Sequence, residues 1–226
     1  MYLDLFKLTG RIALVTGGGR GIGLACAEAL AEAGARLTIA DRDASLADQG
    51  RMTLRAKGYD ADTVIMDVAN SGRVTQVADE MVARYGRIDN GTFWCCRAFG
   101  SHMLQAQSGA IVNIGSMSGF IVNKPQEQSY YNASKAAVHH LTKSLAAEWA
   151  ARGVRVNAVA PTYIATPLTA FVESDPVMYD AWITNTPMAR LGRVEEIASV
   201  VLFLASDAAS LMTGSIVLAD GGYTCW

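Results

Sequence analysis

Two residues that could move a proton, Tyr131 and Lys135, lie four positions apart in the stretch YYNASKAAV, and Ser116 precedes the tyrosine by fifteen positions. In a helix this spacing puts the phenol and the ammonium on one face. A positive charge beside a phenol favours the phenolate. Phenols ordinarily titrate near ~10, so a base that works near pH 7 needs about 4 kcal/mol from its surroundings. With Ser116 bonding the same substrate oxygen, the set suits removal of a proton from an alcohol while a hydride leaves its carbon.

A nucleotide-binding turn is predicted near the start of the chain, and it strengthens the case for the Tyr–Lys pair, which alone also occurs by chance on surface helices. Residues 11–23 read RIALVTGGGRGIG, in which an apolar, β-branched run meets a glycine-rich turn and then a helical pattern at 22–33. The glycines permit a tight turn and let a pyrophosphate reach the helix N-terminus, where N–H groups and the helix dipole favour anions. The predicted cofactor-binding residues in this stretch are Gly17, Arg20, Gly21, Ile22 and Gly23.

A second apolar run, ARLTIADRD, leads into Asp41, 18 residues after Gly23. An acidic residue at about this distance typically binds the ribose 2′-hydroxyl of NAD, and its charge repels the 2′-phosphate of NADP. Arg20 and Arg42 keep NADP possible. The structural alternative for Asp41 is the N-cap of the helix that follows. The candidates near the adenine, in the stretch DTVIMDVAN, are Asp67 and Val68.

These ordered motifs resemble the classical short-chain dehydrogenase/reductase family, almost end to end, through TGGGRGIG, IVNIGSMSG, YYNASKAAV, GVRVNAVAP and TGSIVLADGG. The resemblance implies an NAD(P)-dependent oxidoreductase. It implies that Ser116 positions the substrate oxygen, that Tyr131 is the general acid/base, and that Lys135 favours the phenolate and binds the nicotinamide ribose. The residues it places at the nicotinamide amide are Pro161, Ile164 and Thr166. The segments GSMSGFIVNKPQ and DGGYTCW, with the longer Ser-to-Tyr spacing, look most like bacterial polyol dehydrogenases of the galactitol, ribitol and arabinitol type.

Composition argues against several other classes of protein. The 226 residues are 51% hydrophobic and 18% charged, with a net charge of −2, which favours one α/β domain with a full core. There is no basic stripe for nucleic acid and no apolar run near the ~20 residues of a membrane span. The start, MYLDLFKLTG, lacks the basic and apolar regions of a signal peptide. The four cysteines show no metal spacing, so we expect reduced thiols, no bound metal and a cytoplasmic location.

Strand-like and helical patterns alternate along the chain, which predicts an α/β fold with a doubly wound parallel sheet of Rossmann type. The strand-like runs lie near 12–16, 36–41, 62–67, 110–115, 154–159 and 215–219. The helical patterns lie near 21–33, 43–57, 72–85, 91–107, 130–151 and 194–205. We expect a single dinucleotide-binding and catalytic domain over residues 1–226. A small substrate flap is expected at about 162–190, with a plain packed helix pair as the alternative for that segment.

One stretch departs from the family pattern. After YGRID the family has a fourth strand ending in N-N-A-G, a helix, and a catalytic asparagine in an N-x-x-G segment, whereas this chain passes from Asp89 to NGTFWCCRAFG. A strand, a helix and their connections correspond to roughly 25–30 residues. In the family order 3-2-1-4-5-6-7 this strand is central, so its loss leaves the flanking strands about 10 Å apart, twice the strand spacing. We therefore expect the natural protein to carry such a segment between Asp89 and Asn90. The alternative is a genuine deletion, which cripples the fold.

Three functions remain open on the sequence. The first is NAD-dependent interconversion of a polyol alcohol and a ketose, since polar side chains between Ser116 and Tyr131 suit a substrate with many hydroxyls. The second is NADPH-dependent reduction of a 3-oxoacyl thioester. Asp41 argues against NADPH, and the polar side chains between Ser116 and Tyr131 argue against an acyl chain as the substrate. The third is a catalytically silent nucleotide-binding protein, which the missing asparagine segment supports and the intact Ser–Tyr–Lys set opposes. The expected substrate contacts are Ser116, Ser118, Asn123, Gln126, Tyr131 and Thr162.

A homotetramer is expected as well. The helical patterns near 91–107 and 130–151 have more apolar positions than one sheet face covers, and the resemblance implies pairing of these helices and of the C-terminal strands across two interfaces. The terminal GGYTCW then lies near a subunit boundary, where its carboxylate could hold a divalent cation, although no ligand motif indicates one.

Overall fold

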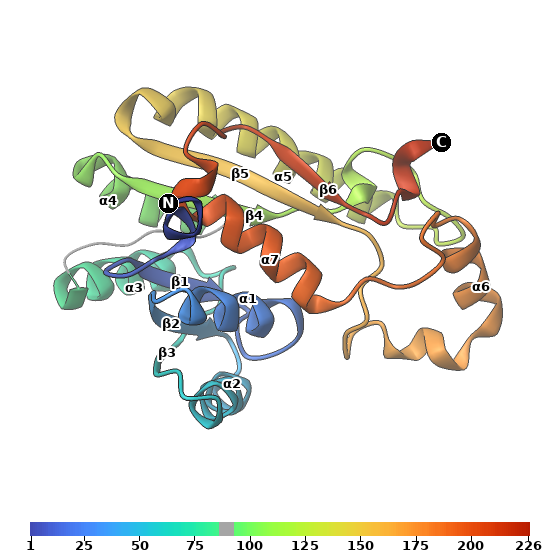
Figure 1. Ribbon diagram of the computed structural model, residues 1–226, viewed down its shortest axis with the longest axis horizontal. Helices are drawn as coiled ribbons and strands as arrows, with labels where there is room; N and C mark the ends of the chain where they lie inside the picture. Colours follow the sequence, from blue (N-terminus) through green and yellow to red (C-terminus); the bar gives the residue numbers. More distant parts are fainter. Residues whose placement is uncertain (86–92) are drawn as a thin grey trace.

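The computed structural model describes residues 1–85 and 93–226. In these residues, six strands are interspersed with helices, as the sequence pattern predicts (Figure 1). The strands are β1 (Ile12–Thr16), β2 (Arg36–Asp41), β3 (Ala61–Ile65), β4 (Gly109–Ile114), β5 (Val154–Pro161) and β6 (Ile216–Ala219). The helices are α1 (Gly21–Glu32), α2 (Ala44–Ala56), α3 (Ser71–Tyr85), α4 (Phe93–Ala106), α5 (Ser129–Trp149), α6 (Pro176–Thr184) and α7 (Val194–Ala205). The predicted α/β fold class is confirmed.

The strands form two parallel sheets of three strands each, in the orders β1-β2-β3 and β4-β5-β6. Leu14 of β1 pairs with Thr38 of β2, and Ile111 of β4 pairs with Val156 of β5. In the described part of the chain no ladder joins β1 to β4. The two sheets are therefore arranged like two halves of the expected sheet without its central strand. The break expected between Asp89 and Asn90 lies outside the described residues.

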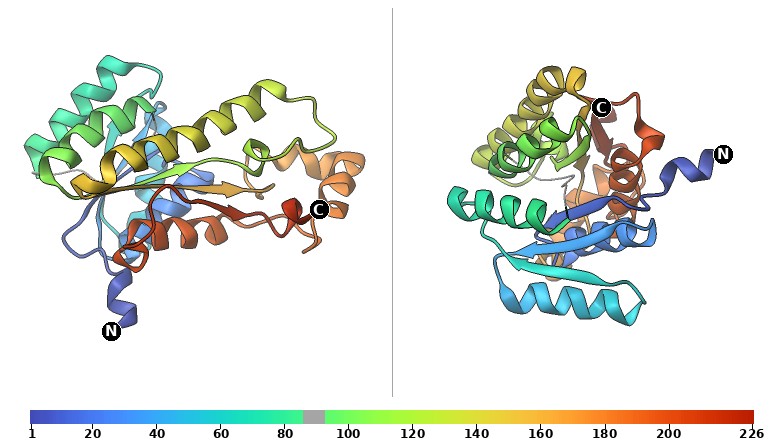
Figure 2. Two further views of the ribbon diagram at one scale, coloured as in Figure 1. Left: turned by 90° about the horizontal axis from the view of Figure 1, so that it is seen from above. Right: turned by 90° about the vertical axis from the view of Figure 1, so that its left-hand side faces the viewer.

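Helices cover both faces of the sheets (Figures 1 and 2). α1 packs on α7 along one face, whereas α5 and α4 pack on β5 and β4 from the other, where α3 contacts α4. Beneath α4 and α5, one apolar cluster joins Leu14 of β1 to Ile111 of β4 through Phe99 and Met103. The two halves thus share a core although their strands are not paired.

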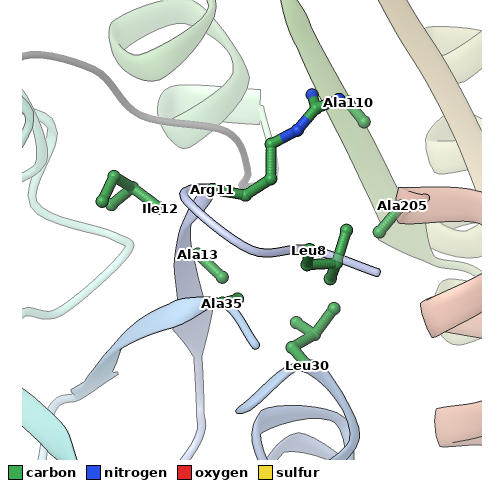
Figure 3. A pocket seen from close by; sticks show the side chains of 8 residues that line it. All are labelled: Leu8, Arg11, Ile12, Ala13, Leu30, Ala35, Ala110 and Ala205. Atoms are coloured by element: carbon green, nitrogen blue, oxygen red, sulfur yellow. The ribbon is translucent and has the colours of Figure 1, made fainter. Parts of the chain in front are cut away.

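Space remains between β1 and β4. A cavity of about 250 Å³ is lined by Leu14 of β1 and by Val112 and Ile114 of β4. A second, smaller cavity lies near the other end of the two strands, where Ala13 of β1 and Ala110 of β4 line the same space (Figure 3). Protein interiors are ordinarily close-packed, with few voids larger than a water molecule. The two cavities therefore mark a place between the half-sheets that more protein could fill.

Residues 162–190 form a loop, a short 3-10 turn (Ala170–Ser174) and α6, which project beyond the ends of β4 and β5 (Figure 1). This is the position expected for the substrate flap, and it contains one α-helix rather than a packed helix pair. Trp182 is buried, whereas Phe171 and Tyr179 are exposed. A bridge between Ile164 and Gly192 closes the base of the segment. Closure over a substrate remains a prediction.

Among the described residues, no helix combines the length and the apolarity needed to cross a bilayer.

The four cysteines are thiols, and Cys26, Cys95 and Cys96 are buried. Burial raises the pKa of Cys26 and of Cys96 to about 12, so these two thiols stay protonated and unreactive.

Candidate active site

Helix α5 carries Tyr131 and Lys135 in its first two turns, as the spacing predicts. The Lys135 ammonium lies 5.5 Å from the centroid of the Tyr131 ring and donates a hydrogen bond of 3.0 Å to the carbonyl oxygen of Ile114. Burial lowers the pKa of Lys135, whereas Tyr131 is 36% exposed and open to solvent. The structure thus brings the predicted base and its cation together beside the carboxyl end of β4.

Ser116 follows β4 at the strand end where a parallel sheet presents ligand-binding residues. It is buried, and its hydroxyl oxygen accepts a hydrogen bond of 3.2 Å from the N–H of Ser118. This bond orients the oxygen and leaves the hydroxyl proton for another acceptor. Helix α5 packs on the short turn Met117–Gly119 that follows Ser116. Ser116, Tyr131 and Lys135 therefore belong to one packed unit, although no hydrogen bond joins Ser116 to Tyr131 in the described residues.

The glycine-rich turn connects β1 to α1, as predicted. Gly17 has a φ of +64°, a left-handed conformation that favours glycine. A Cβ atom at Gly23 would lie 2.1 Å from the carbonyl oxygen of Gly17, so no larger residue fits there. Arg20 is the exposed N-cap residue of α1, and Ile22 lies in the first helical turn. The backbone can therefore approach a pyrophosphate closely at the N-terminus of α1.

Asp41 ends β2 with its carboxylate against this turn. Its Oδ2 accepts a hydrogen bond from the N–H of Gly19, and its Oδ1 accepts one from the N–H of Asp43, both at 3.2 Å. The N-cap of α2 is Asp43, which accepts from the N–H groups of Ser45 and Leu46. The capping alternative for Asp41 is therefore wrong. Its carboxylate lies beside the glycine-rich turn, as a ribose-binding role requires.

The other predicted cofactor residues follow β3 or lie at and after the end of β5. Asp67 and Val68 are exposed after β3, and the Asp67 carboxylate accepts a hydrogen bond of 2.9 Å from the N–H of Ala69. Thr166 reaches the glycine-rich turn, because its Cβ lies 3.9 Å from the position that a Cβ would take at Gly21. The remaining two are Pro161, which ends β5, and Ile164, which is buried.

Thr162 gives an independent indication of a ligand in this region. Its hydroxyl oxygen is buried and has no hydrogen-bond partner among the described residues. Buried polar groups are ordinarily bonded, so an orphaned hydroxyl at a strand end suggests a group that the bound molecule supplies. Together with the glycine cradle and the Asp41 carboxylate, this hydroxyl makes the site fit a nicotinamide dinucleotide.

A polar network joins the segment after Ser116 to the flap. The Oδ1 atom of Asn123 accepts hydrogen bonds from the Ser118 hydroxyl at 2.8 Å and from the Gln128 amide at 2.9 Å. Its Nδ2 donates to the Tyr163 hydroxyl at 2.6 Å, and that hydroxyl donates to Gln126 at 3.3 Å. Ser118 and Asn123 are buried, so the network fixes their orientation from within the protein.

Tyr163 has no motif of its own in the sequence, yet it holds this network to the flap. Its ring stacks on Trp182, with centroids 3.8 Å apart and planes 4° apart, and meets Tyr223 edge-on at 5.8 Å. Burial raises the pKa of Tyr163, so its hydroxyl stays protonated. Its partners come from three distant segments of the chain, which sequence spacing alone does not bring together.

The chain matches two family models in succession. Residues 11–90 match the model described as short chain dehydrogenase, and residues 90–224 match the model described as enoyl-(acyl carrier protein) reductase. A galactitol 2-dehydrogenase of Rhizobium johnstonii is 50% identical over 256 residues, which cover 100% of this chain and 99% of that protein. The crystal structure of gox2181 is 49% identical, with a TM-score of 0.97 and full coverage of both chains. A gluconate 5-dehydrogenase from Burkholderia cenocepacia J2315, in complex with NADP and tartrate, is 34% identical, with a TM-score of 0.93 and full coverage of both chains.

The same comparisons bear on the expected break. The 256 residues of the alignment include all 226 of this chain, so at least 30 residues of the galactitol dehydrogenase have no counterpart here. The two family models meet at residue 90, where the family's fourth strand was expected. By its motifs, its fold and these end-to-end matches, the chain belongs to the short-chain dehydrogenase family, oxidoreductases that bind NAD(P) and act on CH–OH groups.

Proposed function

We propose that the protein is an NAD-dependent polyol dehydrogenase, which interconverts a secondary alcohol of a polyol and a ketose. The observation that carries this proposal is the packing of α5 on the end of β4, which holds Tyr131 and Lys135 beside the turn of Ser116. The likeness to a galactitol 2-dehydrogenase supports a polyol as the substrate class.

The residues of this site have distinct roles in the proposed reaction. Tyr131, as the phenolate, takes the proton of the substrate hydroxyl and returns it in the reverse direction. The Lys135 ammonium stabilises the phenolate, and its bond to the Ile114 carbonyl keeps it in place. Ser116 donates its hydroxyl proton to the substrate oxygen and so orients the alcohol. The nicotinamide supplies the hydride acceptor when it is bound.

Asp41 is the reason for proposing NAD over NADP. Each of its carboxylate oxygens accepts one hydrogen bond from the backbone and can accept a second one from a ribose diol. A carboxylate also repels a 2′-phosphate. Exposed Arg20 and Arg42 flank the site and favour NADP as the second candidate, in line with the NADP bound to the Burkholderia cenocepacia enzyme.

The polar network supports a polyol over a 3-oxoacyl thioester. Because the Ser118 hydroxyl donates its proton to Asn123, it can only accept a hydrogen bond from a substrate. A polyol hydroxyl donates such a bond, whereas an acyl chain has no donor. The retained Ser116, Tyr131 and Lys135 oppose a catalytically silent protein, for which side-chain chemistry at this position would serve no purpose.

We also propose a single domain over residues 1–226 and a cytoplasmic homotetramer that binds no nucleic acid. Apolar side chains near the C-terminal strand are exposed, among them Leu218 of β6 and the terminal Trp226. Burial of these side chains by a second subunit would favour association. A divalent cation at the terminal carboxylate stays outside this proposal, because the described residues contain no cluster of three metal-ligating side chains.

The test is a survey of initial rates over galactitol, ribitol and arabinitol, with NAD and NADP in parallel. We expect turnover with at least one polyol and a higher kcat/KM with NAD. Reduction of a 3-oxoacyl thioester with NADPH, in the absence of polyol oxidation, would establish the second candidate instead. Tight NAD binding without turnover of either substrate class would establish the third candidate, a catalytically silent nucleotide-binding protein.

A further inference from the structure

His139 lies on the face of α5 that carries the catalytic pair, four residues after Lys135 and eight after Tyr131. It is 5% exposed. Its Nε2 atom faces the backbone N–H of Ser116 at 3.5 Å, and its Nδ1 atom has no hydrogen-bond partner among the described residues. An imidazole nitrogen that faces an N–H group must be the unprotonated one, which assigns the proton to Nδ1. The ring therefore presents an acceptor to the residue proposed to bind the substrate oxygen.

The turn that carries Ser116 follows the outline of this ring. A Cβ atom at Gly115 would lie 2.5 Å from Nε2, and one at Gly119 would lie 2.5 Å from Cε1. The Phe120 ring covers the imidazole, with centroids 4.5 Å apart. Residues on both sides of Ser116 thus leave space that the histidine fills.

We propose that His139 is a positioning residue for Ser116, which it holds against α5 through the bond from the Ser116 N–H to Nε2. The proposal rests on the proposed role of Ser116 in binding the substrate oxygen. Lys135 supplies a second tie, to the carbonyl of Ile114. The two ties lie on either side of Gly115, so they fix the serine relative to the Tyr131 phenol on the same helix.

The charges around the ring favour its neutral form. Burial lowers the pKa of His139, and the positive charges of Lys135 and Lys143 on α5 lower it further. Residues 115–120, which pack on the ring, contain no ionisable side chain. Strand β5 also packs on α5, and its charged residue is Arg155, whose guanidinium donates to the carbonyl groups of Leu204 and Ser206. Strand β5 therefore adds no negative charge that would favour a protonated imidazole. The imidazole is therefore neutral near pH 7, as an acceptor at Nε2 requires.

A space-filling role is the competing explanation, because any ring of this size would fill the space beside Gly115 and Gly119. The two explanations differ in what they change. A filler affects the free energy of unfolding alone, whereas a positioning residue affects kcat, through Ser116, and makes kcat depend on the protonation of an imidazole.

Four variants separate these explanations: His139→Leu, His139→Gln, Ser116→Ala and the double variant Ser116→Ala/His139→Leu. Each is assayed for kcat, for KM with the best polyol, for NAD binding and for Tm. Because misplacement of a reacting group can cost up to two orders of magnitude, we expect His139→Leu to lower kcat by about tenfold or more at unchanged NAD affinity. Glutamine offers an oxygen near the place of Nε2, so His139→Gln should recover most of this loss. The double variant should be no slower than Ser116→Ala alone, since His139 acts through Ser116.

The pH dependence of kcat distinguishes the two explanations, because a side chain that only fills space does not alter it. The profile is measured for ketose reduction, in which Tyr131 acts in its protonated form and acid pH does not impair it. We expect kcat of the unmutated protein in this direction to fall at acid pH as His139 becomes protonated, and His139→Gln to lose this fall. Unchanged kcat in a folded His139→Leu, independent losses in the double variant, or an unaltered acid fall in His139→Gln would each overturn the proposal. If His139→Leu does not fold, the pH profile of His139→Gln decides alone. Unchanged kcat in Ser116→Ala would contradict the proposed role of the serine instead, so the two failures are distinguishable.

Discussion

At the scale of single residues, Asp41 shows how one carboxylate can couple the fold to the choice of cofactor. Its bonds to the N–H groups of Gly19 and Asp43 hold the end of β2 to the glycine-rich turn. The nearby Asp43 caps α2 and so carries the structural role that the sequence left open for Asp41.

We predict that Asp41→Ser shifts the cofactor preference from NAD towards NADP. Hydrogen bonds to a charged group contribute about 1.5–3 kcal/mol, so kcat/KM with NAD should fall by roughly tenfold or more. The NADP value should hold or rise, since the repulsive charge is removed. Steady-state kinetics with both cofactors checks this. Asp43→Ser is the matched control, because serine also caps helices and the preference should not change. Better NADP use than NAD use by the unmutated protein would contradict the assignment.

At the scale of elements, the flap is tied to the rest of the molecule at both of its ends. Tyr163 links its start to Asn123, Trp182 and Tyr223. Glu196, in the first turn of α7, accepts hydrogen bonds from Arg190 at 2.8 and 2.6 Å and from the N–H of Arg193 at 2.8 Å. These two anchors set the position of the segment between them.

Tyr163→Phe keeps the ring that stacks on Trp182 and removes only the hydroxyl that meets Asn123. A neutral hydrogen bond contributes about 1 kcal/mol, so we predict that KM for the polyol rises by roughly fivefold while NAD affinity is unchanged. Tyr179→Phe, at an exposed position of α6, is the control and should leave KM as it is. Equal KM values for all three proteins would show that the network does not reach the substrate.

Glu196 should stabilise the protein in a pH-dependent manner. The side-chain bond to Arg190, aided by the Arg193 N–H, lowers the pKa of Glu196 to about 2, from 4.5 in the unfolded chain. A lowered folded-state pKa means that the contribution is fully present above about 4.5 and is lost as the pH falls towards 2. Because the pair is partly exposed and screened, we expect Glu196→Ala to lower the free energy of unfolding by about 1 kcal/mol at pH 7.

Urea unfolding at pH 7 and pH 3 measures this effect, and the difference between Glu196→Ala and the unmutated protein should shrink at the lower pH. Glu195→Ala removes the same charge from the exposed neighbouring position and serves as the control. A difference that grows on acidification would contradict the sign of the assigned pKa.

Hydrophobic periodicity and glycine signals predict all six strands and six of the seven α-helices that residues 1–85 and 93–226 form, because these patterns are local. The Tyr131–Lys135 pair is predictable for the same reason, since four residues make one helical turn. His139 and Tyr163 are not, because their partners come from distant elements and neither belongs to a motif. The role of Asp41 is intermediate: its distance from Gly23 suggests the ribose, but only the geometry shows that Asp43 takes the cap.

At the scale of the whole molecule, the two half-sheets are the feature that most needs an explanation. They share a core but enclose cavities between β1 and β4, and the family models divide at residue 90. An added central strand would fill this space and pair with both neighbours. We predict that the natural protein carries a segment of about 30 residues between Asp89 and Asn90, which would account for these observations together.

Intact-protein mass spectrometry of the natural protein tests this directly. At the mean residue mass of this chain, 24.0 kDa for 226 residues, 30 further residues add about 3 kDa. A measured mass of 24.0 kDa would instead establish a genuine deletion and favour the silent nucleotide-binding function.

The central claim is that Tyr131 is the acid/base of an NAD-dependent alcohol oxidation, and the rate of NADH formation from galactitol by Tyr131→Phe tests it most directly. Phenylalanine keeps the ring and lacks the proton carrier, whose contribution is typically 10²–10⁴-fold. We predict a loss of at least about a hundredfold in kcat with NAD binding and Tm unchanged. Retention of more than about a tenth of the unmutated rate, well above what loss of a general base allows, would contradict the claim.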